Sequence, residues 1–494
     1  MSALSGYDSE AVGFESIAPE RKPGSETSTQ TCEFGESGVG SQTVLSKDIG
    51  CTADPEDLED DIFKEYPPPG LNDFLRKVVP TMMEQLDQND KEMLYNSSDS
   101  EDEEAIIAKV SQELKLEGHG LGAGDHRSSI LSCTWSSAGN SLAISIGETQ
   151  HETWCQNPGL IKVYTLKRSE GDKLVHTLDI SEKNCVTVLK FHPAVAALLA
   201  YGTVTGEVVL YSLMTNRPCH DEGLTSPSGC HGSRRVSALL WADAHLANTF
   251  LTMQINSKGK RRGASDQILV SAGSDGTLNV WQVNANLKIF ENVICYTLNA
   301  NRKPAPDITC FDFIKRYCLR SFDEKVAEDI FVVGTKSGKL FLCKIRGCEE
   351  GVLDPVHEEL EGHSTCVLDV AFCFQKPGVF VSVSMDSELR LYNVAQTCPL
   401  KVFCLDVAVS CMAWLGSSAC VVLGLAAGKE AVRVYNAANG RAVPIEGFHG
   451  ESSVTCVAVT QSGSYRVVVG HEDGKLQVWE IPARRARFTA DEDF

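Results

Sequence analysis

The sequence predicts an all-β protein, a seven-bladed β-propeller that follows a disordered acidic N-terminal arm. From about Ser128 onward, short β-branched runs alternate with turns of Gly, Asp and Ser, which is the pattern of an all-β domain. Seven similar strand openings recur in this part of the chain, and the closing strands that follow them lie 43 to 70 residues apart. A repeat of about 40 to 45 residues with four strands per unit is typical of a propeller blade.

Each predicted blade has the same order of elements. The opening strands begin at Ile130, Cys185, Val236, Ile308, Val367, Val409 and Val454. An apolar strand, a glycine-containing turn and a closing strand follow each of them. The closing strands carry Tyr164, Tyr211, Trp281, Cys343, Tyr392, Tyr435 and Trp479. Because one blade cannot bury both of its faces alone, we expect the blades to stack into a closed ring.

Two of the spacings are long enough to hold insertions. We place one at Asn256–Ser265, a basic surface loop, and the other at Asn299–Asp307. The sequence therefore predicts blades of unequal length, with a basic loop that leaves the third blade.

Turn residues before the closing strands support the same repeat. Asp275, Asp386 and Asp473 stand where a tight turn is expected, since Asp and Gly cap such turns or reach positive φ. His363 and His449 precede blades five and seven. Together with the closing aromatic residues they resemble the GH…WD signature of WD repeats. We expect these histidines and aspartates to form structural hydrogen bonds within their own blade, not to act as acids or bases.

The arm divides into segments of different composition. Residues 1–70 are rich in Ser, Gly, Thr, Glu and Asp with isolated apolar residues, so they cannot bury enough surface to offset ordering entropy. Residues 71–125 form a helical segment and linker before the propeller at 126–482, and 483–494 is a tail. Within 71–86, apolar residues recur at three- and four-residue steps, which predicts an amphipathic helix that Pro80 kinks or divides. Ile106–Leu116 is predicted as a second short helix.

Composition excludes several classes of partner. The chain of 494 residues has a formal net charge of -21, so we expect neither nucleic acid, which requires clustered Lys and Arg, nor anionic lipid as a partner. The N-terminus lacks the basic start and apolar run of a signal peptide, and no apolar stretch is long enough to span a bilayer. We therefore expect an intracellular protein without membrane insertion, whose 19 scattered cysteines are reduced.

No pattern of an enzyme is present. The strings of serine hydrolases, zinc proteases and P-loop enzymes are missing, so we expect no catalytic residue, no cofactor and no small-molecule substrate. Cys219-His220 and Cys230-His231 form a pair of Cys-His dipeptides. Four soft ligands could hold zinc, but adjacent dipeptides constrain the geometry poorly. We favour solvated loop residues over a metal site.

The arm contains two copies of a short motif. Thr29, Gln30 and Thr31 form one string, and Ser41, Gln42 and Thr43 form the other. An extended segment of this kind can add as a strand to the sheet edge of a partner. Two sites on one flexible strand suit a dimeric partner, because the second contact is intramolecular.

The order of these features resembles that of dynein intermediate chains, in particular the intermediate chain of the retrograde intraflagellar-transport dynein (cytoplasmic dynein two). Asp73–Asn89 looks like the family's helix before the propeller. Phe191-His192-Pro193 with Gly202–Tyr211 is similar to its second blade, and Val379–Tyr392 to its fifth. Departures are Pro80 within the helix and Tyr201, where the family has a glycine.

The resemblance implies a set of partners. The propeller would bind a dynein heavy chain, beside a second intermediate chain. The helix would bind a roadblock-type light chain through Leu71, Phe74, Leu75, Val78, Met82 and Leu86. The two S/T-Q-T strings would recruit the dimeric light chain that reads such motifs. The ATPase would reside in the heavy chain.

The expected location is the cytoplasm and cytoskeleton, with the cilium or flagellum, its axoneme and basal body. Two other interpretations stay open. One is an axonemal dynein intermediate chain, which shares the propeller and the arm. The other is a WD-repeat scaffold or substrate receptor of a different complex, such as a ubiquitin ligase.

Overall fold

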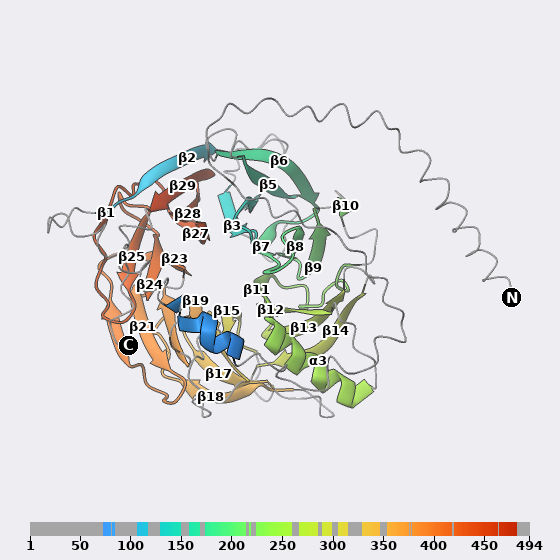
Figure 1. Ribbon diagram of the computed structural model, residues 1–494. Helices are drawn as coiled ribbons and strands as arrows, with labels where there is room; N and C mark the ends of the chain where they lie inside the picture. The colour runs from blue at the N-terminus through green and yellow to red at the C-terminus, as the bar shows by residue number, and fades with distance from the viewer. Residues whose placement is uncertain are drawn as a thin grey trace. The chain divides into compact units, whose positions relative to one another are not determined.

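The computed structural model divides the chain into two units, Met1–Asp102 and Glu103–Phe494, and the second unit is a seven-bladed propeller (Figure 1). The predicted fold class is thereby confirmed. The structure describes residues 73–80, 82–83, 106–116, 129–149, 158–167, 173–213, 217–218, 224–258, 266–284, 289–298, 305–314, 329–345, 353–374, 376, 378–416, 419–462 and 464–481. The predicted disordered arm at 1–70 and the tail at 483–494 lie outside these residues.

The first three blades are antiparallel sheets of consecutive strands. Blade 1 holds β3 (Ser129–Trp135), β4 (Ser141–Gly147), β5 (Gly159–Lys167) and β6 (Lys173–Glu182). Blade 2 holds β7 (Val186–Phe191), β8 (Leu198–Thr203), β9 (Val208–Ser212) and β10 (Arg217–Pro218). Blade 3 holds β11 (Val236–Trp241), β12 (Gln267–Gly273), β13 (Thr277–Asn284) and β14 (Ile289–Thr297).

Blades 4 to 6 continue the same order. Blade 4 holds β15 (Ile308–Phe313), β16 (Ile330–Thr335), β17 (Leu340–Lys344) and β18 (Val356–Leu360). Blade 5 holds β19 (Val367–Phe372), β20 (Val379–Ser384), β21 (Glu388–Asn393) and β22 (Lys401–Cys404). Blade 6 holds β23 (Val409–Trp414), β24 (Cys420–Leu425) and β25 (Val432–Asn436), and its outer edge is covered by the chain around Ala442, which bridges Tyr435.

Blade 7 combines three strands from the end of the propeller sequence with one strand that precedes blade 1. Its inner strands are β27 (Val454–Ser462), β28 (Ser464–His471) and β29 (Lys475–Ile481), and its outer strand is β2 (Lys109–Lys115), antiparallel to β29. Just before it, β1 (Ile106–Ile107) pairs in parallel with β26 (Ile445–Glu446). In Figure 1, β2 (blue) lies along β29 (dark red), which closes the ring.

The predicted helix over Ile106–Leu116 is therefore wrong. A helix of this length is marginal in water, because its first turn fixes several dihedrals for a single hydrogen bond. As a strand, the segment satisfies its backbone on β29 and packs Val110 and Leu114 against two buried clusters. The partner strand is distant in sequence. Gln477 Nε2 of β29 donates to Glu113 Oε1 of β2 at 2.8 Å, and the two residues are 364 positions apart.

Side chains of β2 and β27 join blade 7 to blade 1. The amide of Gln112 donates to Leu174 O at 3.0 Å and accepts from Leu174 N at 2.8 Å, on the outer strand of blade 1. Thr455 Oγ1 donates to Ile130 O, and Ser129 Oγ donates to Glu472 O at 2.6 Å. The seam is thus bonded at both the outer and the inner strands.

Neighbouring blades approach closely at a glycine. A Cβ on Gly334 would lie 2.7 Å from Val367 Cγ1 of blade 5, and one on Gly470 would lie 2.7 Å from Ile130 Cγ2 of blade 1. Threonine beside this contact adds a hydrogen bond to the next blade, as Thr309 Oγ1 donates to Val367 O at 2.7 Å. Such close packing explains why the repeat alternates Gly on one blade with Val or Ile on the next.

The inner strands β3, β7, β11, β15, β19, β23 and β27 surround a central channel of about 690 Å³. An insertion leaves blade 3 between β11 and β12 as α3 (Ala244–Lys258). Asp243 caps this helix, because its Oδ1 accepts from Leu246 N at 2.8 Å. Phe250 then packs edge-on against Phe313 of blade 4, with ring centroids 6.1 Å apart. The predicted loop at Asn256–Ser265 thus begins in α3, a helix that the sequence patterns did not indicate.

Removing β2 should open the ring. A variant that lacks residues 1–103 keeps β1 and β2, and we expect it to melt close to the full chain. A variant that lacks residues 1–116 exposes the edge of β29, so we expect a clearly lower melting temperature and self-association through that edge. Thermal denaturation and light scattering after size exclusion measure both. If the two variants melt at the same temperature and both remain monomeric, closure of the ring by β2 is contradicted.

Gly334→Ala should destabilise the interface between blades 4 and 5 by about 1–3 kcal/mol, because the added methyl group overlaps Val367 and Cys310. Denaturant unfolding gives this free energy. Cys310→Ala removes one of the two overlaps, so the double variant should lose less stability than the sum of the single variants. Additive losses of stability would show that the overlap with Cys310 is not what destabilises the Gly334→Ala variant.

Candidate functional site

The helix before the propeller presents apolar side chains. Residues 73–80 and 82–83 are helical, as the spacing of apolar residues predicts, with Pro80 in the last position of the longer piece. Phe74 is 59% exposed and Met82 58% exposed, and Leu75 and Val79 are also exposed, while Val78 is half-buried. Leu71 and Leu86 lie outside the described residues.

The two S/T-Q-T strings also lie outside the described residues. Their assignment to light-chain binding stays a prediction.

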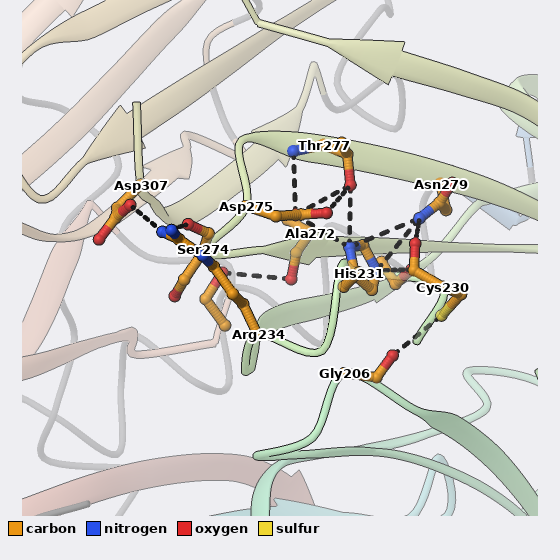
Figure 2. Close-up of polar contacts among 12 residues, drawn as sticks. Gly206, Cys230, His231, Arg234, Ala272, Ser274, Asp275, Thr277, Asn279 and Asp307 are labelled. Atoms are coloured by element: carbon orange, nitrogen blue, oxygen red, sulfur yellow. Dashed lines mark hydrogen bonds and ion pairs between the residues drawn. The ribbon is translucent and has the colours of Figure 1, made fainter. Parts of the chain in front are cut away.

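Blade 3 holds a buried hydrogen-bond network around His231 (Figure 2). The ring contacts Ser271 Oγ through Nε2 at 2.8 Å, and Thr277 Oγ1 and Asp275 Oδ1 through Nδ1 at 3.0 and 3.3 Å. Trp281 Nε1 donates to Ser271 Oγ at 2.8 Å. The network links the loop before β11 to the turn between β12 and β13, so it holds the two loops of this blade together.

Sequence reasoning missed His231 as part of this network and placed it in a solvated loop. That placement is wrong, since the residue is fully buried. The sequence has Cys-His here where Gly-His precedes blade 5, which hid the relation. Its position could have revealed it, because His231 stands five residues before Val236 and His363, which enters its own blade, stands four before Val367.

The Cys-His dipeptides do not form a metal site through His231, since both of its ring nitrogens contact side chains of the blade. Cys230, which is half-buried, donates its thiol to Gly206 O at 2.9 Å. Cys219 and His220 lie outside the described residues.

Burial by itself raises the pKa of Asp275, but hydrogen bonds and charge attraction from His231 and hydrogen bonds from Thr277 outweigh it, so the pKa is lowered. The carboxylate thus stays ionised and bonded at neutral pH. It serves the network and is poorly suited to exchange protons.

Blade 5 has a related arrangement around His363. Nε2 contacts Ser382 Oγ at 2.6 Å and Nδ1 contacts Ser384 Oγ at 2.7 Å. Asp386 accepts from the backbone and hydroxyl of Ser364. Tyr392 replaces the tryptophan, stacks on Phe380 at 4.9 Å between centroids, and donates to Glu361 O at 2.6 Å.

Among the described residues, one group of three ligand-type side chains converges. Atoms of His363, Asp386 and Glu388 lie within 4.8 Å of one another. Arg390 Nη2 lies 2.7 Å from Glu388 Oε2 and offsets one of the two carboxylate charges of this group. Since His363 is also hydrogen-bonded at both nitrogens, the group is structural and no metal ion is needed to explain it.

Blade 7 departs from the other two. Trp479 is buried, yet its Nε1 has no hydrogen-bond partner, since Val469 stands where blade 3 has Ser271. His449 does not enter the blade: its side chain is 58% exposed, lies edge-on to Trp479 at 4.9 Å and contacts Glu113 of β2 at 3.4 Å. The expected bond to the turn of its own blade is absent from the described contacts of His449.

The remaining repeat residues are structural in position. Asp473 accepts from Lys475 N at 3.1 Å and is exposed. Tyr435 is buried, and its hydroxyl contacts Asp406 at 3.4 Å.

Two buried histidines make the fold sensitive to acid. Burial lowers the pKa of His192 to about 4, and burial together with the charge of Arg390 lowers the pKa of His363 to about 4. The unfolded chain binds protons at these positions below about 6.5, while the folded chain does so only near 4. Their contribution to stability is therefore complete above about pH 6.5 and falls as the pH drops toward 4.

His192→Asn should weaken this dependence. The histidine Nδ1 accepts from Ala194 N at 3.0 Å and Val195 N at 2.8 Å, and an asparagine oxygen can accept the same bonds without titrating. Between pH 7.5 and 5, the variant should lose about 1–2 kcal/mol less unfolding free energy than the unchanged chain. His357→Asn, at an exposed position, is the control. Equal losses in all three proteins would contradict a role for His192.

Comparisons with known proteins agree with this structure. The family described as WD domain, G-beta repeat matches residues 354–393, which run from β18 of blade 4 through β21 of blade 5, and residues 443–480, which run from β26 into β29 of blade 7. None of the described helices is long and apolar enough to cross a membrane.

Curated relatives are dynein intermediate chains. The chain is 20% identical to cytoplasmic dynein 2 intermediate chain 2 of Homo sapiens over 84% of its own length and 77% of that protein. It is 20% identical to the Mus musculus protein of the same name, over 90% and 82%. It is 23% identical to dynein intermediate chain 2, ciliary, of Heliocidaris crassispina. This match covers 61% of the present chain and 39% of that protein. The resemblance found in the sequence is thus confirmed: this WD-repeat propeller is similar to dynein intermediate chains.

Proposed function

We propose that the protein is a non-catalytic intermediate chain of a dynein motor complex, which links the heavy chain to light chains for retrograde intraflagellar transport and for assembly of the cilium or flagellum. One observation carries this proposal. The similarity to cytoplasmic dynein 2 intermediate chain 2 extends over 84% of the chain, so it includes sequence outside the WD repeats.

The structure of the propeller supports a binding role without chemistry. The buried polar groups of blades 3 and 5 bond to one another within each blade. The histidine pKa that is lowered to about 4 in blade 5 leaves the ring neutral and engaged. A rigid ring of this kind offers two faces and a rim to protein partners.

The arm would carry the light chains. Gln30 and Gln42 are 12 residues apart, so the two strings can add as strands to both halves of one dimeric light chain. Once the first string is bound, the second binds at a high effective concentration. The residues that we assign are Thr29, Gln30, Thr31, Ser41, Gln42 and Thr43.

The helical residues 73–80 and 82–83 would bind a roadblock-type light chain. Phe74, Leu75 and Met82 are exposed, and an amphipathic helix with large exposed apolar side chains fits a groove on a partner. Burial of such side chains contributes about 1.5–3 kcal/mol each. The full set that we assign is Leu71, Phe74, Leu75, Val78, Met82 and Leu86.

The proposed complex contains a heavy chain, a second intermediate chain and the two kinds of light chain. We place it in the cytoplasm and cytoskeleton, at the basal body and along the axoneme. The ciliary relative from Heliocidaris crassispina favours one second candidate, an axonemal dynein intermediate chain.

Affinity purification of the tagged full chain, followed by mass spectrometry, tests the proposal. A dynein heavy chain with small light chains is the expected result. Recovery of cullin or adaptor subunits without any dynein chain would overturn it. Live imaging then separates the two dynein candidates, since a transport subunit moves along the axoneme and an axonemal subunit stays fixed in it.

Gln30→Ala with Gln42→Ala should abolish co-purification of the dimeric light chain, because both strand-addition sites lose their central side chain. The heavy chain and the roadblock-type light chain should remain. Ser46→Ala with Thr52→Ala changes two polar residues outside the strings and should keep all partners. If the light chain remains at its normal level in the Gln30/Gln42 variant, the assignment of these strings is wrong.

A further inference from the structure

One mouth of the central channel carries two cations on neighbouring blades. Arg235 is exposed and lines the channel just before β11, and Lys336 is exposed at the turn between β16 and β17. In the part of the chain that the structure describes, neither side chain forms an ion pair. By contrast, Lys339 is paired with Glu359 at 2.6 Å.

The backbone holds these residues on three neighbouring blades. Ser274 N donates to Arg235 O in blade 3, Lys336 N to Asp307 O in blade 4, and Met385 N to Cys366 O in blade 5. In each blade, this bond ties the turn after the second strand to the residue before the first strand. The three pairs therefore stand next to one another around the same end of the channel.

The thiol of Cys366 lies within electrostatic range of both cations. Burial raises the pKa of its thiol, and the charges of both Lys336 and Arg235 act in the opposite direction. Cys366 also lines the channel. Beside it, Met385 is 63% exposed. We call Arg235, Lys336, Cys366 and Met385 the cationic mouth.

Nearby acidic groups do not neutralise the cationic mouth. Asp307 contacts Arg234 at 3.5 Å, as Figure 2 shows, and so is directed to a third cation. Asp369 lines the channel further along β19, and its Oδ1 accepts from Val370 N at 2.9 Å. This arrangement favours a carboxylate at the rim and disfavours one deeper in the channel.

We propose that the cationic mouth docks an acidic peptide segment of a partner protein, with carboxylates on Arg235 and Lys336 and an apolar side chain against Met385. Residues 126–494 hold 36 Lys and Arg against 38 Asp and Glu, so this part of the chain is close to neutral overall. The local cations of the mouth therefore provide the preference for carboxylates.

Nucleic acid fits this surface less well. Nucleic acid binding depends on several phosphate contacts, and the mouth offers two unpaired cations. Met385, exposed beside these charges, suits a peptide that combines acidic with apolar side chains. The surface therefore suits a peptide, and this assignment does not depend on which motor complex the chain belongs to.

Fluorescence anisotropy with the full chain tests the proposal. The probe is a fluorescein-labelled peptide, Gly-Leu-Glu-Glu-Leu-Glu-Glu-Gly, and the matched peptide has Gln in place of each Glu. We expect saturable binding of the Glu peptide that weakens with added salt, and at least tenfold weaker binding of the Gln peptide.

Variants locate the site. Arg235→Glu with Lys336→Glu should weaken binding of the Glu peptide at least tenfold. Lys173→Glu with Arg441→Glu makes the same change of charge at exposed positions on blades 1 and 6 and should change binding less than twofold. Met385→Ser should weaken binding of both peptides. Circular dichroism and melting temperature confirm that each variant folds.

Three results would overturn the proposal. They are no binding of the Glu peptide, equal binding of the Glu and Gln peptides, and equal weakening by the two charge-reversal pairs. The last result would show that net charge, and not the cationic mouth, governs the interaction.

Discussion

The pairing of β2 with β29 is the interaction on which the rest of the propeller depends. A propeller leaves few free edges only if its first and last blades meet. Here a strand from before the first blade completes the last one. Gln112 then bonds to β6 of blade 1, and Thr455 of β27 bonds to Ile130 of β3. Without β2, blade 7 has a bare edge and blade 1 loses a neighbour, so the remaining interfaces are no longer held in a ring.

Within that ring, close packing joins neighbouring blades, and local hydrogen bonds connect the loops within each blade. Glycine on one blade makes room for Val or Ile on the next, as at Gly334 and Val367, and buried apolar clusters fill the space between blades. His231 and His363 connect loops within their blades. Because these polar groups satisfy one another, the interior is rigid, and the surfaces left for function are the faces, the rim and the segments before β1.

Local patterns were enough to predict the blades and were not enough to predict the closure. The opening strands repeat one arrangement of apolar residues, which a reader of the sequence can count. In Ile106–Leu116, the strand conformation depends on pairing with β29, hundreds of positions away. No periodicity within the segment itself indicates this partner. His231 escaped notice because Cys replaces the preceding Gly. The helix α3 depends on contacts with blade 4, such as Phe250 with Phe313. For the candidate site, the sequence identifies motifs in the arm, but only the folded ring brings Arg235 and Lys336 to one mouth.

The closure also sets an order of events during synthesis. Glu113 and Gln477, which meet across β2 and β29, are 364 residues apart. At about 5–20 residues per second, a ribosome needs roughly 20–70 seconds to make the chain between them. Until β29 has been made, β2 has no partner strand, and the residues before β2 have already been translated. Light chains can therefore reach their proposed motifs on a nascent chain whose ring is still open, and a chain that terminates early in blade 7 carries those motifs on a propeller that never closes.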